Sequence, residues 1–510
     1  MYQIKEYRGH IRNWKDLCGE LNIDLSLDRE AREQAILTAA YEKWGEKVGD
    51  HIYGMFAFAL EDDETGNIFA CRDQFGAKPF YYYLTEDGRL LYGTFIRQIM
   101  AQDGFVKELN EDMLQLYMTL TYVAGEDTFF KGVKKLLPGR TLTFKDGKLE
   151  IKRYFRPEFH PDNSKSLEQW ADEIHTTVTH IMTEVKEPEE IAESFLSGGV
   201  DSSYVLAVSD VKNADTVGYD DERFDESPLA KVTADYLGVN LNRCRVTPEE
   251  YFAIVPWVME NMEQPLGDAS AIAFALGCKA TAQHTKLCYS GEGSDEFFGG
   301  YNMYRNAERY GENLKTFYVG NTNIMKEDEK KVLLKNYKEG VLPINLVEDI
   351  YKENEGADPL TKMQDVDIQI WLEGDIYFNV DKMSEAAGLE IRMPLTDLRV
   401  FDIASRMPSE YKVNAEQNKV AFRTAASKVI PEDVAFRKKL GFVVPIRHWM
   451  ADPAYNKDVY EKLHGADAEK FFNKAEVEKI WDEYLGGNSD LWRKVWVIYT
   501  FLVWYDIYFN

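Results

Sequence analysis

The stretch Ser197–Ser203, which reads SGGVDSS, decides the fold of this chain. It follows a short apolar run that ends at Leu196 and predicts a strand, and a helical pattern continues from Ser202. The two glycines permit a tight turn, and the backbone amides at a helix N-terminus attract an anion. The serine hydroxyls add donors for a pyrophosphate group, and Asp201 places a carboxylate where Mg²⁺ would bind. A Ser/Gly turn without a ligand is the alternative, but the complete heptad after a strand favours nucleotide binding.

The segments around this heptad alternate between strands and helices. Helical patterns cover 167–186, a run from 202 and 227–237, while extended segments end at 196 or cover 216–219 and 240–246. This alternation is typical of a doubly wound parallel sheet, in which ligands bind at the carboxyl ends of the strands. From residue 332 onward the periodicity is mostly helical, and the apolar run 495–505 predicts a buried C-terminal helix.

The predicted strand before the heptad contains unexpected charges. Glu189, Glu190 and Glu193 lie where a central parallel strand is normally apolar. One interpretation is a strand that begins at a shifted position, and this departure makes the acyl substrate harder to assign.

The first 157 residues have a different pattern and predict a separate domain. Short strand-like runs with turn signals fill it, and the turn KDGK joins two further runs as a hairpin. The predicted strands cover 54–60, 68–72, 79–83, 90–94, 140–144 and 149–154, with helices at 11–21 and 29–44. The Pro- and Asn-containing stretch 157–165 predicts a linker. The expected domains are therefore 1–157 and 166–510.

Composition argues against several classes of function. The net charge of −27 disfavours a nucleic-acid partner, because such proteins carry clustered Lys and Arg. The five cysteines are widely spaced and form neither a metal-ligand nor a redox pair, which indicates a reduced compartment. No apolar run reaches the length of a membrane span, and the charged start MYQIKEYRGH does not resemble a secretory leader. We therefore expect a cytoplasmic protein with neither a membrane nor a nucleic-acid partner.

A second glycine-rich block covers Ser290–Tyr301 and reads SGEGSDEFFGGY, with three acids among four glycines. A solvated acidic loop is one interpretation. However, Phe297 and Phe298 suit burial, and the glycines allow a ligand to approach the backbone closely. Buried acids need partners, and a metal ion or an amine would serve.

In this order the two blocks resemble those of asparagine synthetases, which belong to a larger group of ATP pyrophosphatases that form adenylates. Further blocks extend the resemblance over nearly the whole chain. They are 216–219 (TVGY), 263–272 (EQPLGDASAI), 380–384 (VDKMS), 388–397 (GLEIRMPLTD) and 437–445 (RKKLGFVVP). Because ordered blocks of this kind do not recur by chance, the resemblance is specific to this family.

The resemblance implies ATP and Mg²⁺ as cofactors, and it assigns roles position by position. The resemblance implies a pyrophosphate site made of Ser197, Gly198, Gly199, Asp201, Ser202 and Ser203, and a Mg²⁺ site made of Asp201 and Asp295. The residues implied for AMP are Leu196, Val217, Ser290 and Gly291. Those implied for the acyl substrate are Asp268, Ser270 and Glu390. Lys439 would stabilise the charge that grows on the phosphates during adenylation. Without the flanking GFxxP, the same lysine would be interpreted as a surface residue.

Glu292 helps to separate the possible reactions. By resemblance it would accept a proton from the attacking amine or hold an ammonium ion, although a Glu that caps a turn is the alternative. β-Lactam synthetases resemble the chain in both domains but carry Tyr at this place, so Glu292 favours amide formation between two molecules. We expect aspartate and ammonia to give asparagine, AMP and pyrophosphate. A natural-product amide or lactam synthetase and a catalytically inactive scaffold partner are the competing hypotheses.

The N-terminal domain resembles the glutaminase half of the same family, a β-sandwich of N-terminal-nucleophile type. The matching stretches are 54–60 (GMFAFAL), 71–81 (CRDQFGAKPFY) and 128–139 (TFFKGVKKLLPG). The chemistry of that fold is missing, because Met1 stands in place of the nucleophilic cysteine and RGHIRN in place of NGEIYN. Arg32 takes the place of the substrate-binding Asp. The sequence therefore predicts a truncated, degenerate domain without glutaminase activity.

This prediction bears on the partners of the chain. Nitrogen would come from free ammonia, another amine or a separate ammonia-supplying subunit. A truncated sandwich would also expose an edge or an apolar face, which predicts a covering subunit or a homodimer. A tRNA-modifying ligase lacks support, because the chain has neither a basic patch nor a CxxC pair.

Overall fold

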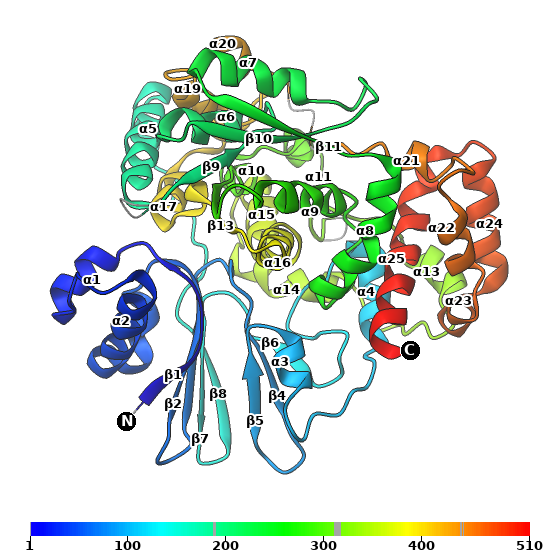
Figure 1. The fold of residues 1–510 in the computed structure, drawn as a ribbon, viewed down its shortest axis with the longest axis horizontal. Coiled ribbons are helices and arrows are strands. Elements are labelled where there is room, and N and C mark those ends of the chain that lie inside the picture. Colours follow the sequence, from blue (N-terminus) through cyan, green and yellow to red (C-terminus); the bar gives the residue numbers. More distant parts are fainter. Residues whose placement is uncertain (1, 187–189, 311–317, 439–440, 442) are drawn as a thin grey trace. The chain divides into compact units, whose positions relative to one another are not determined.

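The computed structural model describes residues 2–186, 190–310, 318–438, 441 and 443–510 (Figure 1). It divides into two compact units, and the chain passes between them more than once. The first unit comprises Met1–Asn110, Ala124–Glu158 and Leu372–Phe378, and the second comprises Glu111–Val123, Phe159–Trp371 and Asn379–Asn510. Each unit is therefore assembled from separate segments of the sequence.

Two antiparallel sheets form the first unit, with the orders β1-β2-β3-β7-β8 and β5-β4-β6. The strands are β1 Tyr2–Ile11, β2 Gly54–Asp62, β3 Ile68–Arg72, β4 Tyr81–Leu84, β5 Leu90–Gly93, β6 Val133–Lys135, β7 Arg140–Lys145 and β8 Lys148–Arg153. The helices are α1 Trp14–Leu21, α2 Arg29–Trp44, the short 3₁₀ helix Gly45–Asp50 and α3 Ile96–Met100. Asp146 and Gly147, both at positive φ, close the β7–β8 hairpin that the turn KDGK predicts.

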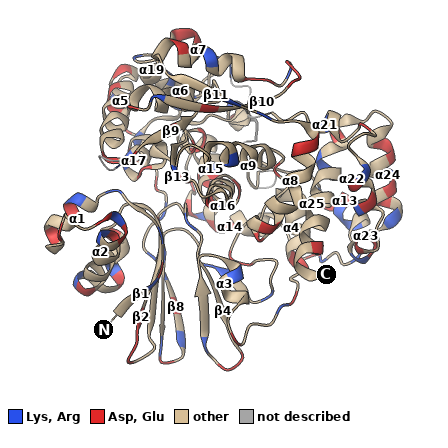
Figure 2. Ribbon diagram, in the orientation of Figure 1, with Lys and Arg blue, Asp and Glu red and all other residues tan. Residues whose placement is uncertain are grey.

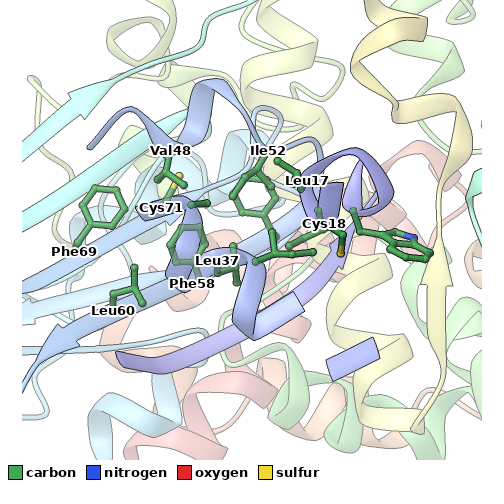
Figure 3. Close-up of a cluster of buried hydrophobic side chains, with 14 residues drawn as sticks. Leu17, Cys18, Leu37, Val48, Ile52, Phe58, Leu60, Phe69 and Cys71 are labelled. Carbon is green, nitrogen blue, oxygen red and sulfur yellow. The ribbon is translucent and has the colours of Figure 1, made fainter. Parts of the chain in front are cut away.

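The larger sheet is packed on both faces. Phe58 and Leu60 of β2 belong to a core that includes side chains of α1 and α2 (Figure 3). The neighbouring Ala57 and Ala59 belong to a second core together with Phe80 and other residues near the smaller sheet. Since successive strand residues face opposite sides, β2 directs its large side chains towards the helices and its small ones towards the second sheet.

A five-stranded parallel sheet lies at the centre of the second unit, as the alternating pattern predicts. Its order is β11-β10-β9-β12-β13, and its neighbouring pairs are all parallel. The strands are β9 Ala192–Phe195, β10 Asn213–Gly218, β11 Asn240–Arg245, β12 Leu287–Tyr289 and β13 Glu390–Arg392. The heptad Ser197–Ser203 follows the carboxyl end of the central strand β9.

The helices between these strands cover both faces of the sheet. They are α6 Val200–Val208, α7 Ser227–Leu237, α8 Pro248–Met262 and α9 Ser270–Thr281. The chain moves outward from β9 to β11 through α6 and α7, and it returns past β9 to β12 after α8 and α9. Since such crossovers are right-handed, α6 and α7 lie on one face and α9 on the other, which can be followed in Figure 1.

The described chain contains further α-helices and one π-helical segment. They are α4 Asp112–Leu120, α5 Leu167–Glu184, α10 Ser294–Phe298, α11 Ala307–Tyr310, α13 Glu327–Leu333, α14 Ile344–Glu353, α15 Pro359–Val366, the π-helical segment Asp367–Tyr377, α16 Phe378–Ala387, α17 Leu398–Arg406, α18 Ser409–Lys412, α19 Val420–Ala426, α20 Glu432–Ala435, α21 Ile446–Trp449, α22 Lys457–Leu463, α23 Ala466–Phe471, α24 Lys474–Leu485 and α25 Trp492–Phe509. The predicted C-terminal helix is α25, and its residues 495–504 are buried.

Among the described helices, none has the length and apolar character that a membrane crossing needs. Acidic and basic residues are interspersed along the helices, with α24 and α7 as clear examples (Figure 2). A surface of mixed charge is compatible with the strongly acidic composition of the chain.

Candidate functional site

The heptad forms a tight turn between β9 and α6 that its own side chains stabilise. Gly198 has a φ of +79°, and a Cβ there would lie 2.8 Å from the amide nitrogen of Ala230 on α7. The Ser202 hydroxyl accepts a hydrogen bond from the Ser197 amide at 3.1 Å and lies 3.1 Å from the Ser197 hydroxyl. Only glycine fits at Gly198, and the turn presents helix N-terminal amides in a fixed arrangement suited to an anion.

Ser203 plays a different part from the other serines of the heptad. Its side chain is fully buried, and its hydroxyl lies 3.2 Å from that of Thr233 on α7. This contact connects α6 to α7 beneath the turn. The structure thus brings Ser197, Gly198, Gly199 and Ser202 together at the turn and places the Ser203 side chain behind it.

The second glycine-rich block packs directly against this turn. A Cβ on Gly291 would lie 2.8 Å from both the carbonyl carbon of Asp201 and the amide nitrogen of Ser202. The Ser294 hydroxyl donates a hydrogen bond to Asp201 Oδ1 at 2.7 Å. The two loops, which follow β9 and β12 at the same edge of the sheet, therefore meet backbone to backbone.

A buried lysine joins the two aspartates that sequence analysis assigns to Mg²⁺. Lys419 Nζ lies 2.6 Å from Asp201 Oδ1 and 2.8 Å from Asp295 Oδ1, and its side chain is 1% exposed. The same nitrogen donates to the Ser294 hydroxyl at 2.8 Å. Lys419 caps the N-terminus of α19 at a φ of +56°. Both carboxylates therefore converge on one cationic point beside the heptad.

Two arginines add positive charge around the same loops. Arg437 Nη1 donates to the carbonyl of Gly198 at 2.8 Å, which fixes the turn from outside. Arg423 donates to the backbone carbonyls of Asn418, Ala435 and Arg437, and so connects the segment that carries Lys419 to the one that carries Arg437. Lys439, which sequence analysis assigns to the phosphates, lies outside the described residues.

Sequence analysis identified neither Lys419 nor the two arginines as site residues. Lys419 follows the polar stretch NAEQN, a pattern typical of an exposed turn. Buried carboxylates on two loops that face each other need a cation to compensate their charge. This need was the signal that could have indicated a residue such as Lys419. The sequence does not indicate which lysine supplies it.

The three acids of the second block occupy different environments. Glu292 is half-buried, and its Oε1 accepts a hydrogen bond from the Ser290 hydroxyl at 3.1 Å. Asp295 pairs with Lys419. Glu296 is buried and accepts a hydrogen bond from the Tyr301 hydroxyl at 2.5 Å. Burial, together with the neighbouring Asp295 carboxylate, raises the pKa of Glu296 to about 8, so Glu296 is neutral at physiological pH.

The residues assigned to AMP lie along the carboxyl ends of the strands. Leu196 is buried, and its amide donates to the carbonyl of Asp215 on β10. Val217 of β10 packs against Gly277 of α9. Ser290 is buried, and its amide donates to the carbonyl of Arg392 on β13. These positions all belong to the sheet edge that also carries the two loops.

The residues assigned to the acyl substrate lie in two different places. Asp268 and Ser270 precede and open α9, and the Ser270 hydroxyl donates to Asp268 Oδ2 at 2.5 Å. Burial raises the pKa of the Asp268 carboxyl. Glu390 is instead the first residue of β13, at the amino end of its strand, where its carboxylate accepts a hydrogen bond from Arg392 at 2.7 Å. The structure thus separates Glu390 from the edge that carries the loops.

Two other blocks of the sequence meet in a buried ion pair. Lys382 Nζ of α16 lies 2.5 Å from Glu263 Oε2, and both side chains are fully buried. Glu263 has a φ of +63°, and its carbonyl accepts a hydrogen bond from Trp504 Nε1 of α25 at 3.0 Å. The pair fixes the start of the loop that leads to Asp268. Breaking such a pair leaves an uncompensated buried charge.

Comparison with known proteins matches both parts of the chain. A family profile described as asparagine synthase matches residues 190–506, and one described as a glutamine amidotransferase domain matches 3–155. Asparagine synthetase [glutamine-hydrolyzing] 1 of Bacillus subtilis (strain 168) is 31% identical, over 98% of this chain and 85% of the relative.

Two further relatives have similar names. A putative asparagine synthetase [glutamine-hydrolyzing] of Mycobacterium tuberculosis (strain ATCC 25618 / H37Rv) is 29% identical over 98% of this chain and 84% of its own length. Asparagine synthetase [glutamine-hydrolyzing] 3 of Bacillus subtilis (strain 168) is 26% identical over 91% of this chain and 78% of its own length. The similarity therefore extends through both units of the chain.

Proposed function

Because the chain belongs to the asparagine synthetase family, we propose that it converts aspartate to asparagine through an acyl-adenylate. The family forms amides at the expense of ATP, so the chain is a ligase. One observation carries the finer proposal: the heptad and the acidic block meet, and both aspartates converge on Lys419 at their junction. Such a junction suits the triphosphate of ATP and the pyrophosphate that leaves it.

In the first step, a carboxylate oxygen of aspartate attacks the α-phosphorus of ATP, and the bond from that phosphorus to the β-phosphate oxygen breaks. The hydroxyls of Ser197 and Ser202, with the helix N-terminal amides of the turn, would hold the departing pyrophosphate. Lys419 would stabilise its growing negative charge, and Arg437 would keep the turn in place. Fixed donors and cations of this kind need little reorganisation during the reaction, which makes their stabilisation effective.

The residues at the junction also fit Mg²⁺, the usual metal partner of ATP. Asp201 and Asp295 supply carboxylate oxygens, the ligands that Mg²⁺ prefers, and both approach one point where a cation is held. We propose that these two aspartates hold the ion. When bound, Mg²⁺ supplies a fixed positive charge next to the phosphates.

In the second step, the nitrogen of ammonia attacks the acyl carbon, AMP leaves, and the new amine must lose a proton. Glu292 is the best placed acid of its block to accept it, because it is half-buried and Asp295 is already paired. Glu296 is unsuited to this role, since its raised pKa keeps it protonated near neutral pH. We therefore assign proton removal to Glu292.

For the nitrogen source we propose ammonia in place of glutamine. Arg32 occupies the position of the acidic residue that would bind glutamine, and its guanidinium stacks on Trp14 at 3.7 Å from the ring centroid. The two cysteines of the first unit, Cys18 and Cys71, are both buried. Burial also raises the pKa of the Cys71 thiol, so its nucleophilic thiolate form is suppressed. The glutamine-hydrolysing activity in the names of the relatives belongs to those proteins.

The test uses the purified chain with ATP, Mg²⁺ and aspartate, and measures pyrophosphate release and isotope incorporation. Nitrogen-15 ammonium should give labelled asparagine and one AMP for each pyrophosphate released. Glutamine labelled at its amide nitrogen should give no labelled product. Labelled asparagine from glutamine alone would overturn the proposed nitrogen source, and a lack of pyrophosphate release with aspartate would overturn the proposed substrate.

A further inference from the structure

Three side chains that the proposed reaction does not use converge on one face of the parallel sheet. Glu193 is the second residue of β9, and Asp215 is the third residue of the neighbouring β10. His284 lies in the turn that follows α9, before β12 begins. The two glycine-rich loops leave the carboxyl ends of β9 and β12 and contain none of these three residues.

The strand geometry explains why the three residues meet. Phe195 and Val217 both approach Gly277 of α9, where an added Cβ would lie 3.0 Å from Val217 Cγ2 and 3.8 Å from the Phe195 ring. Residues two apart on a strand share a face. Glu193 and Asp215 therefore face the side of the sheet that α9 covers, next to the end of that helix.

The polar atoms of the group are close together. His284 Nδ1 lies 3.5 Å from Glu193 Oε2, and His284 Nε2 lies 3.4 Å from Asp215 Oδ1. One nitrogen or oxygen from each residue falls within 4.8 Å of one from each of the others. Glu193 is 4% exposed and Asp215 is 6% exposed, whereas the His284 side chain is 38% exposed. The group is thus buried on the carboxylate side and open to solvent on the imidazole side.

Two of the carboxylate oxygens are left without a hydrogen bond. Neither Glu193 Oε2 nor Asp215 Oδ2 has a hydrogen-bond partner among the residues that the structure describes. The other oxygens accept from amides, Glu193 Oε1 from Asn213 at 3.2 Å and Asp215 Oδ1 from Asn242 at 3.4 Å. These amides orient the carboxylates. Near His284 lie the unpartnered Oε2 of Glu193 and the Oδ1 of Asp215, which also accepts from Asn242.

The negative charges of Glu193 and Asp215 are compensated differently from those of Glu263 and Asp295. Glu263 has Lys382 and Asp295 has Lys419, whereas within the described ranges only His284 comes into ion-pair distance of Glu193 or Asp215. Burial, with Glu193 alongside, raises the pKa of Asp215 to about 8. Two buried carboxylates at a central pair of strands are costly unless a cation or a proton compensates them.

We propose that Glu193, Asp215 and His284 form a binding site for one divalent transition-metal ion, with Zn²⁺ as the best fit. Two carboxylates and one imidazole, with an open side for water, match the three protein ligands and free position of many zinc sites. Imidazole disfavours Mg²⁺ and Ca²⁺, which take oxygen ligands. The ion would connect β9 and β10 to the end of α9 and would stabilise the sheet that carries the heptad.

The experiment uses the full chain after removal of metals with a chelator. Zn²⁺ binding is measured by equilibrium dialysis, and Co²⁺ is used as a spectroscopic probe, both without nucleotide. The variants are D215N, E193Q and H284A. H180A is the matched control, since the exposed His180 side chain pairs with Glu184 at 3.2 Å on α5. Thermal unfolding midpoints are measured for each protein with and without Zn²⁺.

The wild-type chain and H180A should each bind one equivalent of Zn²⁺, and D215N and H284A should bind it at least about 10-fold more weakly. Bound Co²⁺ should give visible bands without a thiolate charge-transfer band, which excludes the cysteines as ligands. The metal-free D215N and E193Q proteins should melt above the metal-free wild type, because each replaces one of two adjacent buried carboxyl groups with an amide that does not ionise. Only the wild type and H180A should gain stability from Zn²⁺.

Equal Zn²⁺ affinity in wild type and H284A would overturn the proposal. The proposal would also be overturned if D215N had a higher thermal unfolding midpoint than wild type and Zn²⁺ did not stabilise the wild type. That result would show that the two carboxyls share a proton and do not bind a metal. The isosteric D215N and E193Q variants keep the shape of the strands, so their metal response can be read even if H284A fails to fold.

Discussion

Lys419 is the residue on which the proposed first step depends most. Changing it to Met keeps the length of the side chain but removes the charge between Asp201 and Asp295. We expect aspartate-dependent exchange of pyrophosphate into ATP to fall by roughly 100-fold or more, as when a fixed transition-state charge is removed. The matched control is Lys428→Met, which breaks a partly exposed pair with Asp172 and should leave the exchange unchanged. Exchange within a few-fold of wild type in the Lys419 variant would refute this role.

Glu296 provides a pH prediction at the same scale. Its pKa is about 8 in the folded chain and near the ordinary value of 4.5 when unfolded, so the folded chain holds one more proton between these values. Stability contributed by this group is therefore full at acidic pH and is lost as pH rises from about 4.5 through 8, by up to roughly 1.4 kcal/mol per pH unit.

Glu296→Gln keeps the hydrogen-bonding shape and removes the titration. The denaturation midpoint of the variant, followed by tryptophan fluorescence, should gain on that of wild type as pH rises from 5 to 9. A constant difference between the two proteins over this range would contradict the raised pKa.

The side chains proposed for catalysis differ in how far they could be predicted. Asp201, Glu292 and Asp295 stand inside glycine-rich blocks whose composition already indicates a ligand. Lys419 could not be predicted, because its role depends on a positive φ at a helix N-terminus and on two loops from other parts of the chain. Glu390 stands in a block that resembles the family, and its carboxylate accepts a hydrogen bond from Arg392 at the amino end of β13, a contact that the sequence does not indicate.

At the scale of elements, the contact between the two loops can be tested with one methyl group. Gly291→Ala would place Cβ 2.8 Å from backbone atoms of Asp201 and Ser202, so the loops must separate. We expect a loss of roughly 1–3 kcal/mol in stability and a larger loss in pyrophosphate exchange. Gly340→Ala is the control, because nothing lies within 4 Å of its added Cβ. Wild-type exchange in Gly291→Ala would show that this contact is not needed.

Most strands of the described chain follow from local patterns, and the departures have physical causes. The hairpin at Asp146-Gly147 was predictable because a two-residue turn at positive φ has a strong sequence signature. β10 begins at Asn213, before the predicted start at 216, because its first residues pair with β11. The Asn213 side chain also donates a hydrogen bond to Glu193 on β9. The π-helical segment Asp367–Tyr377 was not predicted, because π-helices are rare and the pattern from residue 332 onward indicated ordinary helices.

At the scale of the whole molecule, a segment distant in sequence completes the first unit. Glu373 Oε1 lies 2.8 Å from Arg72 Nη2, and Glu373 Oε2 lies 2.6 Å from Lys135 Nζ, with all three side chains at most 4% exposed. Glu373→Ala leaves two buried cations with a missing partner, and we expect the first unit to lose about 3–5 kcal/mol of stability.

The measurement is urea denaturation of the full chain, with proteolysis to report which unit opens first. Glu355→Ala, at an exposed position of the second unit, is the control and should change the midpoint little. Loss of the second unit's protection, with the first unit intact, would contradict this assignment. Sequence analysis placed the domains at 1–157 and 166–510 and had no signal for the return of residues 372–378, because this contact joins positions more than 200 residues apart.

The return of Leu372–Phe378 to the first unit also affects how the chain is made. During synthesis the residues up to Glu158 leave the ribosome long before Glu373 exists, and at ordinary elongation rates the delay is about ten to forty seconds. Throughout that interval Arg72 and Lys135 have no counter-charge from Glu373. The nascent first unit therefore cannot complete this buried ion cluster until about three-quarters of the polypeptide has been translated, although most of its residues come first in the message.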